Sequence, residues 1–324
     1  MNVSIIAGGA GFVGCNLLPL LAKEDRHLMV LDNLCRGREE YLDAARAAAP
    51  GRVHFIHVDL SDRAATLLAF NAAQKLGTVD EVWHLAANSD IPAGVLDANV
   101  DLRDTFMTTF SLLEAMKVHQ VPALHFASSS AIYGDLGGVG LHESIGPLLP
   151  ISNYGAMKLA SEALISAAAE SYLVSANLFR FPNVVGIPAT HGVILDFVNK
   201  LAVAPDHLDV LGDGSQQKAY LHVSDLVAAM LRVRGRSTDH KVEVVNIGPT
   251  DEGVTVRWIA EQVVARVKPG AEIRFGTGNK GWVGDVPKFK YLTDRMQAYG
   301  WAPALGSPGA VARAIDEIAR QQGH

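Results

Sequence analysis

A glycine-rich turn stands between an apolar run and a helical pattern at the start of the chain. Residues 3–7 are apolar except for one serine, Gly8-Gly9-Ala10-Gly11 follows at once, and a helical pattern opens with Phe12 and Val13 and passes through Gly14. So tight a turn needs residues without a Cβ atom, and the free N–H groups at a helix N-terminus attract phosphate. Alone, such a match is as often an ordinary turn. In this order it predicts a dinucleotide site at Gly8, Gly11 and Gly14.

An acidic residue after the second strand supports this interpretation. The apolar run Leu28–Leu31 ends in Asp32, eighteen residues beyond Gly14. A carboxylate at that distance accepts hydrogen bonds from the adenosine ribose hydroxyls and repels a 2′-phosphate, so NAD is favoured over NADP. We expect Asn33 beside it to line the cofactor, together with Leu60 and Asp59, which would meet the adenine amine. Asp59 could almost equally cap the helix that begins near residue 61.

Short apolar runs alternate with helical patterns through the first half of the chain, whereas prolines and glycines become denser after residue 180. This rhythm predicts an α/β fold, a Rossmann-type doubly wound parallel sheet with a smaller, discontinuous α/β substrate lobe. We expect residues 1–180 and 220–248 to form the NAD-binding domain, and residues 181–219 and 249–324 to form the substrate lobe.

Composition excludes several classes of protein. The net charge of −6 disfavours binding to nucleic acid, which needs a dense basic surface. The chain has no apolar run of eighteen residues and no pattern of a signal peptide, so we expect a cytoplasmic protein that does not enter membranes. Cys15 and Cys35 have no spacing typical of a metal site, and we interpret both as plain thiols.

A phenol and an ammonium group stand four residues apart at Tyr154 and Lys158, so they project from one face of a predicted helix. A tyrosine that serves as a base near neutral pH needs its pKa lowered by about three units, or roughly 4 kcal/mol, and Lys158 with an oxidised nicotinamide can supply this. Such a pair alone is more often a surface pair. The serines at 128–130, which end an apolar strand where open sheets place their ligands, favour a catalytic site.

An ordered series of motifs resembles the extended short-chain dehydrogenase/reductases, in particular the sugar nucleotide epimerase/dehydratase group. The series is GGAGFVG at 8–14, LDNL at 31–34, HLAAN at 84–88, SSSAIYG at 128–134, YGAMK at 154–158, FPNVVG at 181–186 and YLHVSD at 220–225. The resemblance implies Ser129 as the catalytic hydroxyl, Tyr154 as the acid/base and Lys158 as the group that binds the nicotinamide ribose and lowers the tyrosine pKa. It also implies cofactor contacts from Leu85, Ala86, Ala87 and Asn99.

The resemblance further implies a nucleotide-sugar substrate, contacted by Asn88, Ser130, Asn183, His191, Lys218 and Asp285. Lys218 and the segment before Asp285 lack the arginines that many relatives use for the diphosphate, and His191 could equally be a neighbour of a helix cap. Relatives often form homodimers through helices like those predicted at 100–119 and 154–171, so we expect a homodimer.

The reaction expected from the resemblance is NAD-dependent epimerisation, at C4, through a transient keto-sugar. Related dehydratases carry an acidic pair where this chain has Ser130 and Ala131, so elimination of water lacks its acid. Two alternatives stay open: a net sugar dehydrogenase or reductase, and a non-catalytic dinucleotide-binding regulator. We expect no bound metal.

Overall fold

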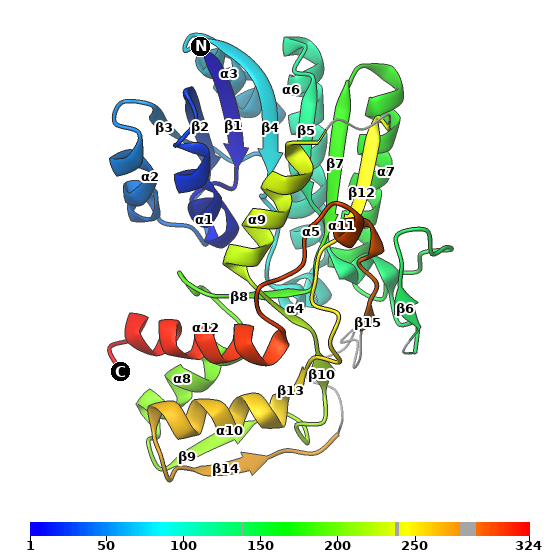
Figure 1. The fold of residues 1–324 in the computed structure, drawn as a ribbon. Helices are drawn as coiled ribbons and strands as arrows, with labels where there is room; N and C mark the ends of the chain where they lie inside the picture. Colours follow the sequence, from blue (N-terminus) through cyan, green and yellow to red (C-terminus); the bar gives the residue numbers. More distant parts are fainter. Residues whose placement is uncertain (138, 237–239, 279–289) are drawn as a thin grey trace. The chain divides into compact units, whose positions relative to one another are not determined.

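The structure is a computed structural model, and it describes residues 1–137, 139–236, 240–278 and 290–324. Its contacts divide the chain into two units. Figure 1 shows the ribbon coloured by residue number from the N-terminus to the C-terminus. The first unit comprises Met1–Gly134, Pro147–Arg180 and Met230–Val245, and the second comprises Asp135–Gly146, Phe181–Ala229 and Asn246–His324.

These boundaries differ from the predicted ones in three places, the smallest of which is residues 246–248, which belong to the second unit. Residues 135–146 join the second unit because the short strand β6 (Gly140–Leu141) pairs with β15 (Lys290–Tyr291). Residues 220–229 also join it, since β11 (Tyr220–His222) pairs with β8 (Asn183–Val185). Local apolar patterns in the sequence carry no information about such long-range pairings.

The first unit is built on a seven-stranded sheet in the order β12-β7-β5-β4-β1-β2-β3. The pairings from β3 across to β7 are all parallel. From β1 the chain adds strands first in one direction, as β2 and β3, and then in the other, beginning with β4. Open α/β sheets bind their ligands at such a reversal, at the carboxyl ends of the strands. The strands are β1 (Asn2–Ala7), β2 (Arg26–Asp32), β3 (Val53–His57), β4 (Thr78–His84), β5 (Ala123–Ala127), β7 (Ser175–Arg180) and β12 (Val242–Asn246). The predicted Rossmann-type sheet is confirmed.

Helices cover both faces of this sheet (Figure 1). Side chains of β1 alternate between the faces, and Val3, Ile5 and Ala7 join one buried core with apolar residues of α3, α6 and α7. The helices α1 and α2 lie on the opposite face (Figure 1). The helical segments are α1 (Phe12–Leu21), α2 (Asp43–Ala48), α3 (Arg63–Gln74), α4 (Ile91–Leu96), α5 (Ala98–Asp101), α6 (Thr108–His119) and α7 (Asn153–Ser171), with 3₁₀ turns at Glu39–Leu42 and Ser130–Tyr133.

The helix predicted over residues 100–119 is not one regular α-helix. It begins as α5, continues as a π-helical segment, Leu102–Met107, and ends as α6. Because π-helical turns are wider than α-helical ones, the segment changes which side chains face inward. Asp101, just before this segment, and Thr105, within it, are both fully buried.

The second unit has its own apolar core, formed by the helices α8, α10 and α12 with β9 and neighbouring strands. In addition to β6, β8, β11 and β15, this unit contains the following elements: β9 (His207–Val210), β10 (Gln217–Lys218), β13 (Val254–Thr255), β14 (Glu272–Phe275), α8 (Val193–Val203), α10 (Val256–Val267), α11 (Asp294–Ala298) and α12 (Ser307–Gln321). The helix α9 (Val223–Arg234) runs across the division between the units. Among the described residues, no helix combines the length and the apolar character needed to cross a membrane.

Candidate active site in the first unit

The glycine turn after β1 is shaped by close backbone contacts. Gly8 has φ of 77°, and a Cβ atom there would lie 2.6 Å from the backbone nitrogen of Ala86. A Cβ atom on Gly14 would lie 2.5 Å from the Cα atom of Gly9. Gly8 therefore fits the turn against the loop after β4, while Gly14 lets α1 pack on the turn.

Gly11 is different, because a Cβ atom there would meet only the carbonyl oxygen of Gly8, at 3.2 Å. The space beside Gly11 is otherwise open, and Gly11 is the N-cap of α1, whose first N–H groups have no intrahelical acceptor. Open space beside free N–H groups is the arrangement that a pyrophosphate requires. The turn therefore fits NAD. Phe12 and Val13 follow as the first, half-buried residues of α1.

Asp32 ends β2 beside this turn. Its carboxylate accepts hydrogen bonds from the backbone N–H groups of Ala10, at 3.0 Å, and Leu34, at 2.9 Å. Burial raises the pKa of Asp32, and these two N–H donors act in the opposite direction. The carboxylate therefore has a fixed orientation at the carboxyl end of β2, where the adenosine ribose of NAD is expected.

The other amino acids expected to contact the adenosine of NAD lie just after the ends of β2 and β3. The Asn33 side chain accepts a hydrogen bond from the backbone N–H of Cys35, and Leu60 is buried. Asp59 is exposed, and its carboxylate accepts hydrogen bonds from the backbone and side chain of Ser61. The cap of α3 is Asp62, so the helix-cap alternative for Asp59 is wrong. Asp59 instead fixes a turn at the end of β3.

The catalytic residues converge at the carboxyl end of β5. Ser129 follows that strand, and the interaction of its side chain with the Tyr154 phenol acts to lower the pKa of that phenol. Tyr154 and Lys158 lie in the first two turns of α7, whose N-cap Ser152 accepts a hydrogen bond from the N–H of Gly155 at 3.1 Å. The Nζ atom of Lys158 lies 5.8 Å from the centre of the Tyr154 ring. The structure thus brings together the three residues that the sequence predicted to act together.

Burial is the largest influence on the pKa values of Tyr154 and Lys158. It raises the pKa of Tyr154 to about 12, against the lowering effect of the Ser129 hydrogen bond. Burial also lowers the pKa of Lys158 to about 7, while the negative charges of Glu162 and Asp101 act to raise it. Without further positive charge, the Tyr154 phenol is protonated throughout the neutral range.

The loop after β4 holds the expected cofactor residues Leu85, Ala86 and Ala87, all half-buried. The backbone N–H of Leu85 donates to the carbonyl of Ala7, which joins this loop to the glycine turn. Asn88 ends the segment and donates from its side chain to Asp101 at 2.9 Å.

Asn99, for which the resemblance implied a cofactor contact, is exposed on α5, and its side chain donates to Asp97. The buried hydroxyl of Thr105, six residues further on, accepts instead from the backbone N–H of Asn88, at 3.2 Å. Thr105 lies within the π-helical segment, whereas Asn99 lies before it on α5.

Glu162 was missed from the sequence, although its negative charge acts on the catalytic Lys158. Glu162 accepts hydrogen bonds from Ser128, at 2.5 Å, and from Arg180. A signal was available, because Glu162 stands four residues after Lys158 and eight after Tyr154, which places all three on one helix face.

The predicted substrate residues are divided between the units. Asn88 and Ser130 lie in the first unit, and Ser130 is 8% exposed. Asn183, at the start of β8, pairs with Tyr220, and Lys218 lies on β10, which pairs with β13. His191, in the loop before α8, contacts the Thr190 hydroxyl at 3.0 Å. Asp285 lies outside the described residues.

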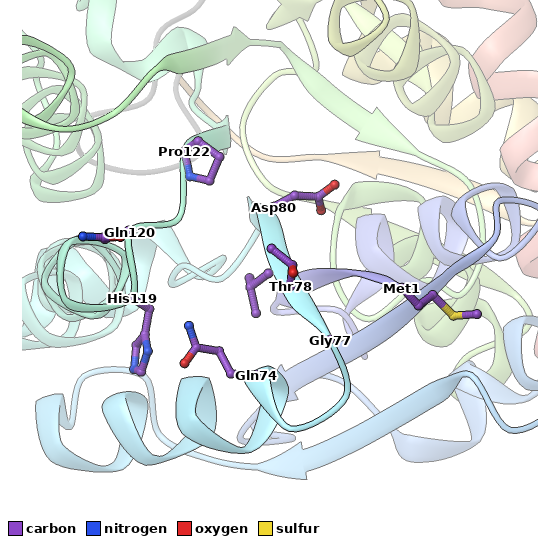
Figure 2. A pocket seen from close by; sticks show the side chains of 9 residues that line it. Met1, Gln74, Gly77, Thr78, Asp80, His119, Gln120 and Pro122 are labelled. Atoms are coloured by element: carbon purple, nitrogen blue, oxygen red, sulfur yellow. The ribbon is translucent and has the colours of Figure 1, made fainter.

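A hollow of about 590 Å³ lies at the opposite, amino edge of the sheet. Figure 2 shows the side chains that line it. Gln74, Thr78, Asp80, His119 and Gln120 line it, together with neighbouring backbone. None of the residues predicted to contact cofactor or substrate lies there. The hollow is therefore separate from the site at the carboxyl end of the strands.

Comparison with known proteins agrees with this geometry. Residues 4–248 match the NAD dependent epimerase/dehydratase family. A UDP-glucose 4-epimerase of Corynebacterium glutamicum is 28% identical over 79% of this chain and 78% of its own length. A crystal structure of a UDP-galactose 4-epimerase superposes with a TM-score of 0.85 at 30% identity, over 99% of both chains. The Thermus thermophilus UDP-glucose 4-epimerase in complex with NAD superposes with a TM-score of 0.83 at 26% identity, over 98% of this chain and 99% of that one.

The family, the fold and the NAD dependence expected from the motifs are thereby confirmed. The chain belongs to the NAD dependent epimerase/dehydratase family.

Proposed function

We propose that this protein is an NAD-dependent epimerase that inverts C4 of a UDP-linked sugar. The single observation that carries the proposal is the meeting of Ser129, Tyr154 and Lys158 beside a glycine turn that fits NAD. The names of the relatives support UDP as the nucleotide and C4 as the centre. A binding protein would need only the turn and Asp32, so the complete catalytic set favours an enzyme.

In this mechanism Tyr154 takes the proton of the sugar C4 hydroxyl at its Oη atom and later returns it. Bound NAD supplies a hydride acceptor and a positively charged ring. Because the pKa of Tyr154 is about 12 in the protein alone, the phenol is not a ready base before the cofactor site is filled. Protonated Lys158 stabilises the phenolate, and the Ser129 hydroxyl orients the same sugar oxygen.

Epimerisation is favoured over dehydration by the residues after Ser129. Ser130 and Ala131 hold the positions at which related dehydratases carry an acidic pair, and both belong to the short 3₁₀ turn at the end of β5. Neither side chain can protonate a departing hydroxyl. The oxidised sugar is therefore expected to be reduced again.

We also propose the roles that the resemblance gives to the second unit. Asn183, His191 and Lys218 would contact the sugar or the diphosphate, and residues 181–219 and 249–324 would supply the substrate lobe. A cytoplasmic homodimer is part of the same proposal. Light scattering that gave the mass of one chain at working concentration would contradict the dimer.

The test is to incubate the protein in deuterated water with UDP-glucose or UDP-galactose, with GDP- and dTDP-linked sugars as comparison. NMR should show the C4 epimer of the UDP-sugar with no deuterium at C4 and no net release of NADH. Stoichiometric NADH release would identify a net dehydrogenase instead. Tyr154→Phe should lose at least ~100-fold in kcat, as expected for a general acid/base, while it still binds NAD. Undiminished turnover by this variant would contradict the assigned chemistry.

A further inference from the structure

A buried ionic cluster lies directly behind the catalytic residues. Glu162 is 5% exposed and Arg180 is 6% exposed, and the two are paired at 2.6 Å. A second hydrogen bond, from the Nε atom of Arg180 at 3.0 Å, makes the contact bidentate. Arg180 also donates to the phenol oxygen of Tyr133. Removing both charges from water costs free energy that their attraction hardly regains. A contribution to the stability of the fold is therefore a weak explanation for a pair buried this deeply.

The cluster reaches the catalytic set from two sides. Ser128, the neighbour of Ser129, donates its hydroxyl to Glu162 at 2.5 Å. On α7, Glu162 stands one turn beyond Lys158, and its negative charge favours the protonated form of that lysine. One carboxylate thus contacts the turn that carries the catalytic hydroxyl and acts on the catalytic ammonium group.

Lys158 needs such a partner because its surroundings disfavour a charge. Its side chain is 2% exposed, and its Nζ atom donates to the backbone carbonyl of Ala127 at 2.6 Å. The Phe126 ring centre lies 4.7 Å from that atom and adds a weak attraction. A buried ammonium without a nearby anion loses its proton readily.

The other charged or titratable groups that act on Lys158 come from different elements. Asp101 on α5 has a negative charge that favours protonated Lys158, and its carboxylate is held by Asn88. His84 at the end of β4 is fully buried, and burial and the Lys158 charge both lower its pKa well below the ordinary value, so it adds no positive charge. Tyr154 is protonated in the protein alone. Glu162 is therefore the anion on the lysine's own helix, with Asp101 as a second.

We propose that Glu162 is a positioning residue of the active site, with two tasks: it keeps Lys158 protonated and it holds the Ser128–Ser129 turn against α7. The proposal rests on the proposed function for its catalytic meaning. The charge of Lys158 can nevertheless be measured without any turnover.

The first test measures the titration of Lys158 by NMR of protein labelled with ¹³C at lysine Cε, with Lys158→Met used to assign the signal. Glu162→Gln retains an oxygen acceptor for Ser128 but removes the negative charge, so the Lys158 pKa should fall below its value of about 7. Each unit of fall reduces the protonated fraction about tenfold at a pH above both values. An unchanged Lys158 titration would overturn the first task.

The matched control is Glu81→Gln. Glu81 is likewise 5% exposed and paired with two arginines, Arg26 at 2.6 Å and Arg234 at 2.7 Å, in the same unit. It lies on β4, three residues before His84 and away from the strand end that carries the site. Its replacement should destabilise the fold to a similar degree without moving the Lys158 titration. An equal shift in both variants would mean that the effect of Glu162 is general.

The second test uses Ser128→Ala, which keeps the Glu162 charge and removes only one small hydroxyl. This variant should fold even if Glu162→Gln does not. We expect its kcat to fall about tenfold with KM nearly constant, because the turn no longer holds Ser129 in place, while the Lys158 titration stays as in the wild type. An unchanged kcat would overturn the second task.

If no nucleotide sugar were turned over by the wild type, the proposed function would fail, yet the titration would still decide the first task.

Discussion

The backbone carbonyl oxygen of Ala131 lies only 2.4 Å from the position that a Cβ atom on Gly155 would take, which leaves no room for a side chain there. Gly155 therefore allows the first turn of α7 to pack on the 3₁₀ turn that follows Ser129. Since Tyr154 is its neighbour, this contact sets the distance between the catalytic phenol and the catalytic hydroxyl. The catalytic geometry depends on a glycine that takes no part in the chemistry.

Replacing Gly155 with alanine should separate the two turns. Because backbone atoms must shift to relieve this contact, we expect a loss of roughly 1–3 kcal/mol in the free energy of unfolding and of about 10–100-fold in kcat. Urea unfolding and epimerase assays measure the two effects. Gly309→Ala is the control, since a Cβ atom there would meet only the Leu305 side chain at ordinary contact distances, and it should cost neither stability nor activity.

The sequence could predict most of the first unit because its signals are local. The turn at Gly8–Gly14, Asp32 at a strand end and the one-turn spacing of Tyr154 and Lys158 are all set within a few residues of chain. The parallel sheet follows from the alternation of strand and helix. The structure accordingly brings the predicted catalytic residues to one strand end.

The rest could not be predicted, for physical reasons that differ from residue to residue. Thr105 accepts from the backbone N–H of Asn88 within a π-helical segment, and a single sequence carries no clear sign of such a segment. The Ser128–Glu162 contact joins residues 34 positions apart, which no local pattern reports. The boundary at residues 135–146 depends on a strand pairing with residues 290–291.

A Gly11→Ala change should separate cofactor binding from folding. The added Cβ atom meets only one oxygen, at 3.2 Å, so we expect the free energy of unfolding to change by less than about 1 kcal/mol. The same methyl group projects into the space where the pyrophosphate is expected, so NAD affinity should fall at least ~10-fold by calorimetry. Equal NAD binding by variant and wild type would mean that the cofactor does not approach this turn.

Asp32→Asn should weaken NAD and improve NADP relative to it. The carboxylate accepts from two backbone N–H groups, and an amide offers only one oxygen in its place, so about 1–3 kcal/mol of stability should be lost. Loss of the negative charge also removes the repulsion of a 2′-phosphate. Titration calorimetry with both cofactors at one ionic strength measures the ratio. Asn33→Ala, which keeps Asp32 intact, should leave that preference for NAD in place.

Lys158→Met should stabilise the protein most at low pH. The folded pKa of Lys158 is about 7, below the ordinary value of 10.5, so between these values the unfolded chain holds a proton that the folded chain has released. Below about pH 7 the folded protein bears the full cost of burying a charged lysine. Between pH 7 and pH 10.5 this cost decreases, so the free energy of unfolding of the wild type rises with pH. Methionine carries no such cost, so its advantage should shrink by about 2 kcal/mol between pH 7 and pH 9.

The measurement is urea unfolding of variant and wild type at several pH values, in which all other titrating groups cancel in the difference. Lys23→Met, at an exposed position of the same unit, should show a difference that does not vary with pH. The variant should also lose epimerase activity, because the phenolate of Tyr154 then has no ammonium group beside it. A stability difference that stayed constant from pH 6 to pH 9 would show that Lys158 is not held in the low-pKa state that its burial implies. Greater stability at neutral pH with lost activity would instead show that this buried lysine is retained for catalysis at the expense of the fold.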